Sequence, residues 1–324
     1  MLQRKLNIAN LKTPIYKLES LSQSLGKDIY IKRDDYTGTE ISGNKVRKLE
    51  YTIQYVLDHG YDTIITTGAI TSNHARATAA VCAQYNIECH LILRGTMAEY
   101  EGNLFLATMS GAHVHLIEPI ASREEAMDTL YIELEEGGKT PFKIPAGGSD
   151  WIGAHGYIDA YEEILEQEIA MEIQFDSINF AVGSGGTYAG LWFGKTSNNL
   201  ATQIIGYAVN KNAETFKNKV IEIIKDLDND TTSFETILIN DEYIGLGYSQ
   251  ATDEELQFYI DIAQQEGIIL DPTYTGKAFR GLVEEIKQGH YDDQQSILFI
   301  HTGGLQGYTQ EIRTRIQQLL LENA

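Results

Sequence analysis

The sequence predicts an α/β protein with two open twisted, largely parallel sheets flanked by helices. Short runs rich in β-branched residues alternate with longer segments in which apolar residues recur every three or four positions. This alternation continues along a chain of 324 residues, which is long enough for about two domains. Strand–helix–strand units join parallel strands by right-handed crossovers, so the alternation favours parallel sheets over hairpins.

In the first half of the chain the helical spacing is clearest in segment 44–57, where Val46, Leu49, Ile53 and Val56 share one face. The same patterns predict strands at 28–33, 63–67, 90–93 and 114–117, and helices at 44–57, 73–85, 104–109 and 123–136. In the second half they predict strands at 178–182, 203–209 and 297–300, and helices at 157–171, 188–198, 214–227, 253–265, 277–287 and 308–321. The glycine-rich segment 145–150 is the best candidate for a joint between the two sheets.

Composition narrows the function classes. The chain has 46 acidic and 25 basic residues, a formal charge of −21, so it lacks the dense Lys and Arg that nucleic acids and anionic lipids require. No apolar run is long enough for a membrane span, and the first residues lead into no apolar signal segment. Cys82 and Cys89 alone can build neither a disulfide framework nor a four-cysteine zinc site. We therefore expect a cytoplasmic protein that handles a small molecule, with no nucleic-acid or membrane partner.

Segment 42–50 combines a Gly-Asn turn, a helix start and three basic residues, Lys45, Arg47 and Lys48. A lysine in the first turn is unusual, because a cation opposes the positive end of the helix dipole. The pattern is compatible with a solvated basic patch. It is equally compatible with a lysine kept partly neutral for Schiff-base chemistry beside a cation for an anionic ligand.

Two further segments place anion-binding groups at helix starts. Ser72 and Asn73 follow a strand and open a helix, which is suited to a carboxylate or is a plain N-cap. Segment 181–187 runs from a strand into a glycine-rich turn, which predicts a phosphate cup. Tyr188 stands where the dinucleotide fingerprint has its third glycine, so a phosphorylated cofactor of another kind is indicated.

The remaining polar patterns are weaker. Segments 271–277 and 301–304 place polar residues and glycines at turns, the second at the carboxyl end of a strand. His113 and His115 share one face of a strand, but no third ligand stands at a suggestive spacing, so we expect no metal site. Cys82 and Cys89 are interpreted as small packing residues.

Together these motifs resemble the fold-type-II pyridoxal-phosphate enzymes related to the β-subunit of tryptophan synthase, in the branch of D-cysteine desulfhydrase and 1-aminocyclopropane-1-carboxylate deaminase. The resemblance covers nearly the whole chain, in order, through segments 13–14, 31–35, 43–50, 72–74, 144–149, 183–187, 271–277 and 301–304. It implies pyridoxal 5′-phosphate as the cofactor, a small amino acid as the substrate, and a homodimer. It also implies a smaller domain, 48–152, inserted in a larger cofactor-binding domain made of 1–47 and 153–324.

The resemblance implies a role for each motif. Lys45 would carry the cofactor covalently and later move the substrate α-proton, Asn73 would bind the cofactor's phenolic oxygen, and Thr275 would face its pyridine nitrogen. Ser72 and its neighbours Asn73 and His74 would bind the substrate, with Tyr248 and Tyr274 close to it. The phosphate would be held by Lys48 together with Gly183, Ser184, Gly185, Gly186 and Thr187.

Thr275 and Thr302 favour the desulfhydrase, since the deaminase typically has Glu and Leu there. A hydroxyl leaves the pyridine nitrogen largely neutral, and the weaker electron sink suits β-elimination. The sequence departs from the usual family pattern at Ser42, Thr71 and Ser249-Gln250. We expect β-elimination of D-cysteine to pyruvate, hydrogen sulfide and ammonia. An L-cysteate sulfo-lyase, a 1-aminocyclopropane-1-carboxylate deaminase and a non-catalytic binder of a phosphorylated ligand are the alternatives.

Overall fold

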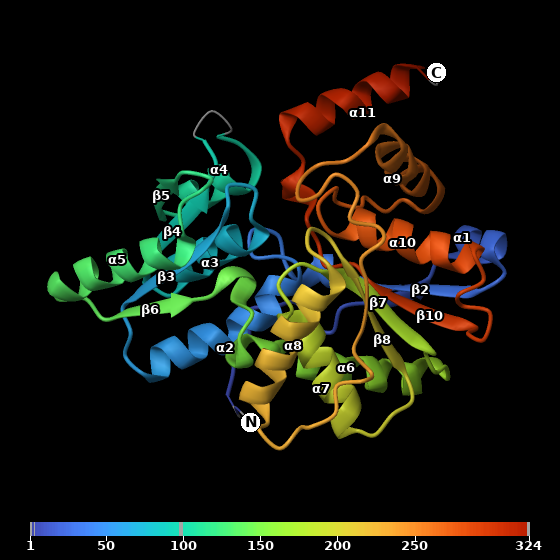
Figure 1. Ribbon diagram of the computed structural model, residues 1–324, viewed down its shortest axis with the longest axis horizontal. Coiled ribbons are helices and arrows are strands. Elements are labelled where there is room, and N and C mark those ends of the chain that lie inside the picture. Colours follow the sequence, from blue (N-terminus) through green and yellow to red (C-terminus); the bar gives the residue numbers. More distant parts are fainter. Residues whose placement is uncertain (1, 3, 97–99, 323–324) are drawn as a thin grey trace.

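The computed structural model describes residues 2, 4–96 and 100–322, which form two sheets side by side (Figure 1). The larger sheet has the strand order β1-β2-β10-β7-β8-β9, in which only β1 runs antiparallel to its neighbour. The smaller sheet has the order β5-β4-β3-β6 and is entirely parallel. The larger sheet contains β1 (Ile15–Lys17), β2 (Asp28–Lys32), β7 (Ser177–Val182), β8 (Gln203–Ala208), β9 (Leu238–Asn240) and β10 (Ser296–Ile300), and the smaller one β3 (Thr63–Ala69), β4 (Glu88–Arg94), β5 (His113–Ile117) and β6 (Pro141–Ile144). The predicted fold class is confirmed.

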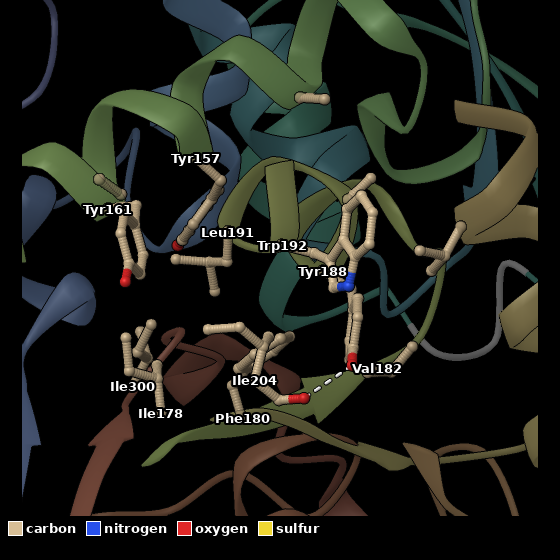
Figure 2. Packing of buried hydrophobic residues seen from close by; sticks show 14 of the residues in the cluster. Tyr157, Tyr161, Ile178, Phe180, Val182, Tyr188, Leu191, Trp192, Ile204 and Ile300 are labelled. Atoms are coloured by element: carbon tan, nitrogen blue, oxygen red, sulfur yellow. Dashed lines mark hydrogen bonds between the residues drawn. The ribbon is translucent and has the colours of Figure 1, made fainter. Parts of the chain in front are cut away.

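Helices cover both faces of the larger sheet. On one face lie α6 (Trp151–Met171), α7 (Gly186–Ser197) and α8 (Ala213–Leu227), and on the other α1 (Glu19–Leu25), α9 (Asp253–Glu266) and α10 (Thr275–Lys287). Alternate strand residues pack on opposite faces, as the pleat of a strand requires. Figure 2 shows the first layer, in which Tyr157, Leu191 and Trp192 of the helices lie over strand residues such as Phe180 and Ile204. The last helix, α11 (Gln310–Glu322), packs on α9.

The smaller sheet is covered in the same way. Helices α2 (Asn44–Asp58), α3 (Asn73–Gln84) and α4 (Gly102–Met109) pack on one face, and α5 (Arg123–Glu136) packs on the other. Cys82 and Cys89 are buried in the first of these layers, in agreement with a packing role. No helix in the described part of the chain is both long and apolar enough to cross a membrane.

The structure corrects several sequence-based predictions. Strands β1, β6 and β9 and helix α1 were not predicted, because segments of three to seven residues carry too little periodicity. Helix α6 begins at Trp151 rather than at residue 157, since Asp150 caps it by accepting a hydrogen bond from the N–H of Gly153 at 2.8 Å. Helix α10 begins at Thr275 rather than 277, and α11 begins at Gln310 rather than 308.

The chain begins in the larger sheet, builds the smaller sheet and then returns. This order is compatible with nested domains, whose boundaries at 1–47, 48–152 and 153–324 stay a prediction. Residues 1, 3, 97–99 and 323–324 of those ranges lie outside the described residues. The expected joint at 145–150 contains a short 3₁₀ helix, η3 (Ala146–Gly148), which lies beside the site described next.

Candidate active site

A cavity of about 340 Å³ lies where the carboxyl ends of β3, β4, β7 and β10 converge. This is the place where parallel α/β sheets bind ligands, and the size suits a small cofactor with its substrate. The structure brings most of the predicted site residues into its wall: Lys45, Ser72, Asn73, His74, Gly183, Ser184, Gly185, Thr187, Tyr248, Tyr274 and Thr302. Lys48, Gly186 and Thr275 lie behind the wall.

Lys45 stands in the first turn of α2, after Gly43, whose φ of 82° turns the chain into the helix. Its Nζ lies in the cavity, 3.2 Å from the carbonyl oxygen of Gly147 in η3. Burial lowers the pKa of Lys45 to about 8, so a substantial fraction of the amine is neutral near physiological pH. Arg47 and Lys48 in the same helix are only 1% exposed, so the interpretation as a solvated basic patch is wrong.

Buried charges fix helix α2. The guanidinium of Arg47 contacts Asp34 at 2.8 Å and Glu163 of α6 at 3.0 Å. Lys32 donates to the same Glu163 at 2.6 Å, and Tyr157 donates to Asp34 at 2.5 Å. Burial alone would raise the pKa of Asp34, but the charges of Arg47 and Lys32 lower it to about 2. This network holds α2, and with it Lys45, against α6.

The glycine-rich turn between β7 and α7 forms a cup at a helix start. Gly185 has a φ of 94° at the N-cap of α7, a conformation that favours glycine. Ser149 connects the cup to α2: its Oγ lies 2.7 Å from Ser184 Oγ, accepts from the N–H of Gly186 at 3.2 Å, and accepts from Lys48 Nζ at 3.1 Å. The free N–H groups of a helix start and a nearby ammonium suit a phosphate.

The start of α3 forms a second anion site in the wall. Ser72 is the N-cap and accepts from the N–H of Ala75 at 3.2 Å. The first N–H groups of a helix have no intrahelical acceptor and are available to a ligand. The ring of His74 is already engaged, with Nε2 2.8 Å from the Thr66 hydroxyl and Nδ1 3.5 Å from that of Thr78. Burial, with the nearby charges of Lys45 and Lys48, holds the pKa of His74 well below its usual range, so the ring is neutral.

Tyr248 and Tyr274 form a hydroxyl pair on the cavity wall. Tyr274 donates to Tyr248 at 2.9 Å, with the two rings nearly perpendicular. Burial raises the pKa of both phenols, so both are protonated at neutral pH. The same wall contains Arg94, at the carboxyl end of β4, and Arg123, at the start of α5. The Nε atoms of both arginines are buried and have no hydrogen-bond partner within the described chain.

Two departures from the family pattern contact each other. Thr71 Oγ1 lies 3.2 Å from Ser249 Oγ, which in turn lies 3.2 Å from the hydroxyl of Thr273. Ser249 has a φ of 54°, which a glycine would adopt without strain. Serine at this position therefore carries backbone strain that glycine would avoid, but its hydroxyl connects Thr71 to Thr273 beside Tyr248.

Thr275 and Thr302 differ in position. The hydroxyl of Thr275 donates to Asp271 Oδ1 at 2.7 Å and accepts from the N–H of Asp271 at 2.7 Å, so both its bonds point into the protein. Burial raises the pKa of Asp271 although the N–H groups of 273–275 hydrogen-bond its carboxylate. Thr302 lines the cavity, and its carbonyl accepts from the N–H of Asn44 at 3.1 Å.

Several wall residues escaped prediction. Gly147 lines the cavity, and Ser149, which does not, contacts Ser184 of the cup. Both belong to a motif that supported the resemblance, but neither received a role. Arg94 had a usable signal, since it is a charged residue at the carboxyl end of a buried strand. The wall also contains Asn44, which follows Gly43, and Asn210 and Lys211, which come shortly after β8; all three stand at a turn or strand end that the sequence shows, but none received a role.

Comparison with known proteins identifies the family of this chain. Residues 6–303 match the family described as "Pyridoxal-phosphate dependent enzyme". The chain belongs to this family. It is 38% identical to D-cysteine desulfhydrase of Serratia proteamaculans, with 93% of both chains covered. It is 41% identical to the mitochondrial bifunctional D-cysteine desulfhydrase/1-aminocyclopropane-1-carboxylate deaminase of Arabidopsis thaliana, covering 93% of this chain and 78% of that one.

Two solved structures agree with the fold. A homologue of 1-aminocyclopropane-1-carboxylate deaminase superposes with a TM-score of 0.90 at 37% identity, covering 98% of this chain and 96% of that one. A threonine deaminase, at 16% identity and a TM-score of 0.66, shares the fold. The protein is accordingly a pyridoxal-phosphate-dependent lyase, and the alternative of a non-catalytic binder is set aside.

The residues of the cavity fit this cofactor. Lys45 offers a partly neutral amine for its aldehyde, and the cup at the start of α7 offers N–H groups for its phosphate. The space is kept open by missing side chains: a Cβ on Gly147 would lie 2.5 Å from Ser184 Oγ, and one on Gly186 would lie 2.9 Å from Lys48 Nζ.

Proposed function

We propose that this lyase converts D-cysteine and water to pyruvate, hydrogen sulfide and ammonia. The observation that carries the proposal is the pairing, in one cavity, of a lysine with a pKa of about 8 and a tyrosine hydroxyl pair beside two arginines. The first group suits removal of an α-proton, and the second suits a departing thiolate. The names of the relatives favour the same substrate.

In this proposal the cofactor, when bound, supplies the electron sink for the α-carbon. Lys45 attaches it, and the cup of 183–187 holds its phosphate, with Lys48 acting through Ser149. Asn73 binds the phenolic oxygen, oriented by Asn103, whose Nδ2 donates to Asn73 Oδ1 at 3.0 Å. Thr302 lies in the wall, and the hydroxyl of Thr275 holds Asp271 outside the wall, on the side where we place the pyridine nitrogen.

The substrate is bound and cleaved by residues of α2, α3 and the tyrosine pair. Ser72 and the first N–H groups of α3 bind its carboxylate. Lys45, released when the substrate amine takes its place, would take the α-proton. The Cβ–S bond would break with its electron pair on sulfur, and the thiolate would take a proton from Tyr274 or Tyr248. Because both phenols are protonated at neutral pH, either can donate. Water then hydrolyses the released enamine to pyruvate and ammonia. His74 positions the start of α3, since its ring nitrogens are engaged with Thr66 and Thr78.

The choice between elimination and ring opening rests on Thr275. Its side chain is a hydroxyl bonded to Asp271, so this position itself offers the pyridine nitrogen no carboxylate. A neutral nitrogen is a weaker electron sink, which suffices when a thiolate leaves promptly. Opening a cyclopropane ring that has no α-proton demands more, so we propose that 1-aminocyclopropane-1-carboxylate is a poor substrate.

L-cysteate is the second candidate substrate, and a specific observation favours it. Arg94 and Arg123 line the cavity, and each has a buried Nε without a partner among the described residues, although a buried donor left unpaired is costly. A sulfonate on the β-carbon would give the two guanidinium groups an anion to bind, whereas a thiol carries no charge before it departs as an anion. The arginines therefore favour either a permanently anionic β-substituent or stabilisation of the leaving thiolate.

A substrate panel with one matched pair of variants separates these functions. Pyruvate or ketobutyrate release is measured with D-cysteine, L-cysteine, L-cysteate and 1-aminocyclopropane-1-carboxylate for the wild type, Arg123→Gln and Arg280→Gln. Arg280, on α10, forms an ion pair with Glu254 of α9, lies outside the cavity wall, and serves as the control. For D-cysteine we expect a lower kcat in Arg123→Gln with little change in KM. Faster turnover of L-cysteate, with its KM raised at least tenfold by Arg123→Gln, would overturn D-cysteine as the substrate.

We also propose a cytoplasmic homodimer, which rests on the resemblance to the family. Light scattering on the purified holoenzyme at micromolar concentration tests the assembly, and a monomer mass would contradict it.

A further inference from the structure

A second cluster of chemically versatile side chains lies on the smaller sheet, away from the cavity. Glu88 and His90 alternate along β4, and His113 and His115 alternate along β5. The two strands are parallel neighbours, with His90 opposite His113 and Ile92 opposite His115. Since residues two apart on a strand share a face, all four side chains belong to one face of the sheet.

Three of these side chains present ligand atoms to a common point. One atom from each of Glu88, His90 and His113 lies within 4.8 Å of the other two. Glu88 Oε1 is 2.9 Å from His90 Nε2 and 3.9 Å from His113 Nε2. Around a tetrahedral zinc ion with bonds of about 2.1 Å, ligand atoms lie about 3.4 Å apart, so small side-chain movements would complete the geometry.

The surroundings orient the central ligand. His90 is 6% exposed, and its Nδ1 lies 2.9 Å from His115 Nε2, so the ring is held with Nε2 toward Glu88. Metal-bound histidines are typically fixed by such a hydrogen bond to the other ring nitrogen. The other carboxylate oxygen of Glu88 accepts from Lys139 at 2.5 Å, which leaves Oε1 for a ligand. The charge of Lys139 lowers the affinity for a cation but does not occupy the site.

The cluster lies apart from the active-site cavity. It lies at the amino ends of β4 and β5, whereas the cavity lies at the carboxyl ends. Arg94, the cavity residue of β4, is four residues beyond His90, a distance of about 13 Å along the strand. Strand β5 is at the edge of the smaller sheet, next to β4 (Figure 1). The side chains of the cluster connect the two strands.

We propose that Glu88, His90 and His113 bind one divalent transition-metal ion, such as zinc, which clamps the edge strand β5 to β4. Two imidazoles and one carboxylate are a donor set that Zn²⁺ accepts, with water as the fourth ligand. His115 is the positioning residue for His90. The sequence predicted no metal because His113 and His115 have no third ligand at a suggestive spacing; Glu88 and His90 come from the neighbouring strand β4, more than 20 positions earlier in the chain.

The test uses the holoenzyme without any affinity tag and Co²⁺ as a spectroscopic probe, followed by displacement with Zn²⁺. The wild type is compared with His90→Gln, His113→Gln and, as a matched control, His59→Gln. His59 is an exposed histidine after α2, outside the cluster. The visible d–d bands of tetrahedral cobalt report the site independently of the cofactor and of activity, and thermal unfolding reports the clamp.

We expect one equivalent of cobalt per chain in the wild type and in His59→Gln, and a Zn²⁺ affinity at least tenfold weaker in His113→Gln. Zn²⁺ should raise the melting temperature of the wild type and of His59→Gln, but not that of His113→Gln. His113 is exposed, so its variant should fold even where His90→Gln does not. Cobalt bands of equal strength in His113→Gln and His59→Gln, or no bands in the wild type, would overturn the proposal.

Discussion

Adding one methyl group at Gly147 should disable the active site, while the same change at Gly148 should not. Both glycines lie in η3 with positive φ, 76° and 56°, so alanine at either position costs about 1–2 kcal/mol of backbone strain. Only at Gly147 does the new Cβ meet the site. It would lie 2.5 Å from Ser184 Oγ and 3.2 Å from Lys45 Nζ, whereas at Gly148 the nearest atom, on His74, is 3.4 Å away.

The two variants should therefore be equally destabilised but unequal in activity. Displacement of a catalytic group by about 1 Å costs about 100-fold in rate, so we expect kcat for pyruvate release to fall by about that factor in Gly147→Ala. Titration of the apoenzyme with pyridoxal phosphate should show weaker binding in the same variant. Gly148→Ala should keep both properties near those of the wild type. Equal loss in both variants, or wild-type activity in Gly147→Ala, would refute the assignment of Gly147 to the cofactor cradle.

Three further outcomes follow from the structure. Arg47→Leu leaves Asp34 and Glu163 without their main cation, so denaturant unfolding should show a free energy of unfolding lower by about 3–5 kcal/mol. Lys143→Met, which removes an exposed ion pair, should lower it by less than about 1 kcal/mol, and similar losses in both variants would contradict a buried network. Ser249→Ala keeps a Cβ at a φ of 54° and loses the hydroxyl bonds, so it should be less stable than Ser249→Gly by about 1 kcal/mol in the same assay, and equal stabilities would argue against strain at this position. Because Lys45 has a pKa of about 8, the rate at which apoenzyme attaches the cofactor should rise about tenfold per pH unit below pH 8 and level off above it, and a rise continuing to pH 10 would contradict the lowered pKa.

The motifs could be found from the sequence because each anion-binding feature is local. A strand followed directly by glycines or by Ser72 and a helical pattern already specifies free N–H groups at the carboxyl end of a strand. Lys45 could be recognised for the same reason, since a cation in the first turn of a helix opposes the positive end of the helix dipole and is therefore unusual there. Resemblance to a family then supplied the order of these motifs along the chain.

The roles of other residues could not be predicted, because they depend on contacts between segments that are distant in the sequence. Ser149 links the cup to Lys48 across 101 positions of sequence, and Thr71 meets Ser249 across 178. Thr275 was expected at the cofactor, yet its hydroxyl is bonded to Asp271, which no local pattern indicates. The arginines of the cavity come from a strand end and a helix start that are neighbours only after folding.

The sequence by itself determined the fold class, the cofactor family and the residues that open each anion-binding helix, because periodicity and helix starts depend on neighbours along the chain. The tertiary structure alone decided which polar groups are buried together. These groups are Lys45 with its lowered pKa, the two arginines of the cavity whose Nε atoms have no partner among the described residues, and the cluster of Glu88, His90 and His113. Burial and the distances between charges depend on how separate strands and helices pack, and pKa values and ligand geometry depend on burial and distance.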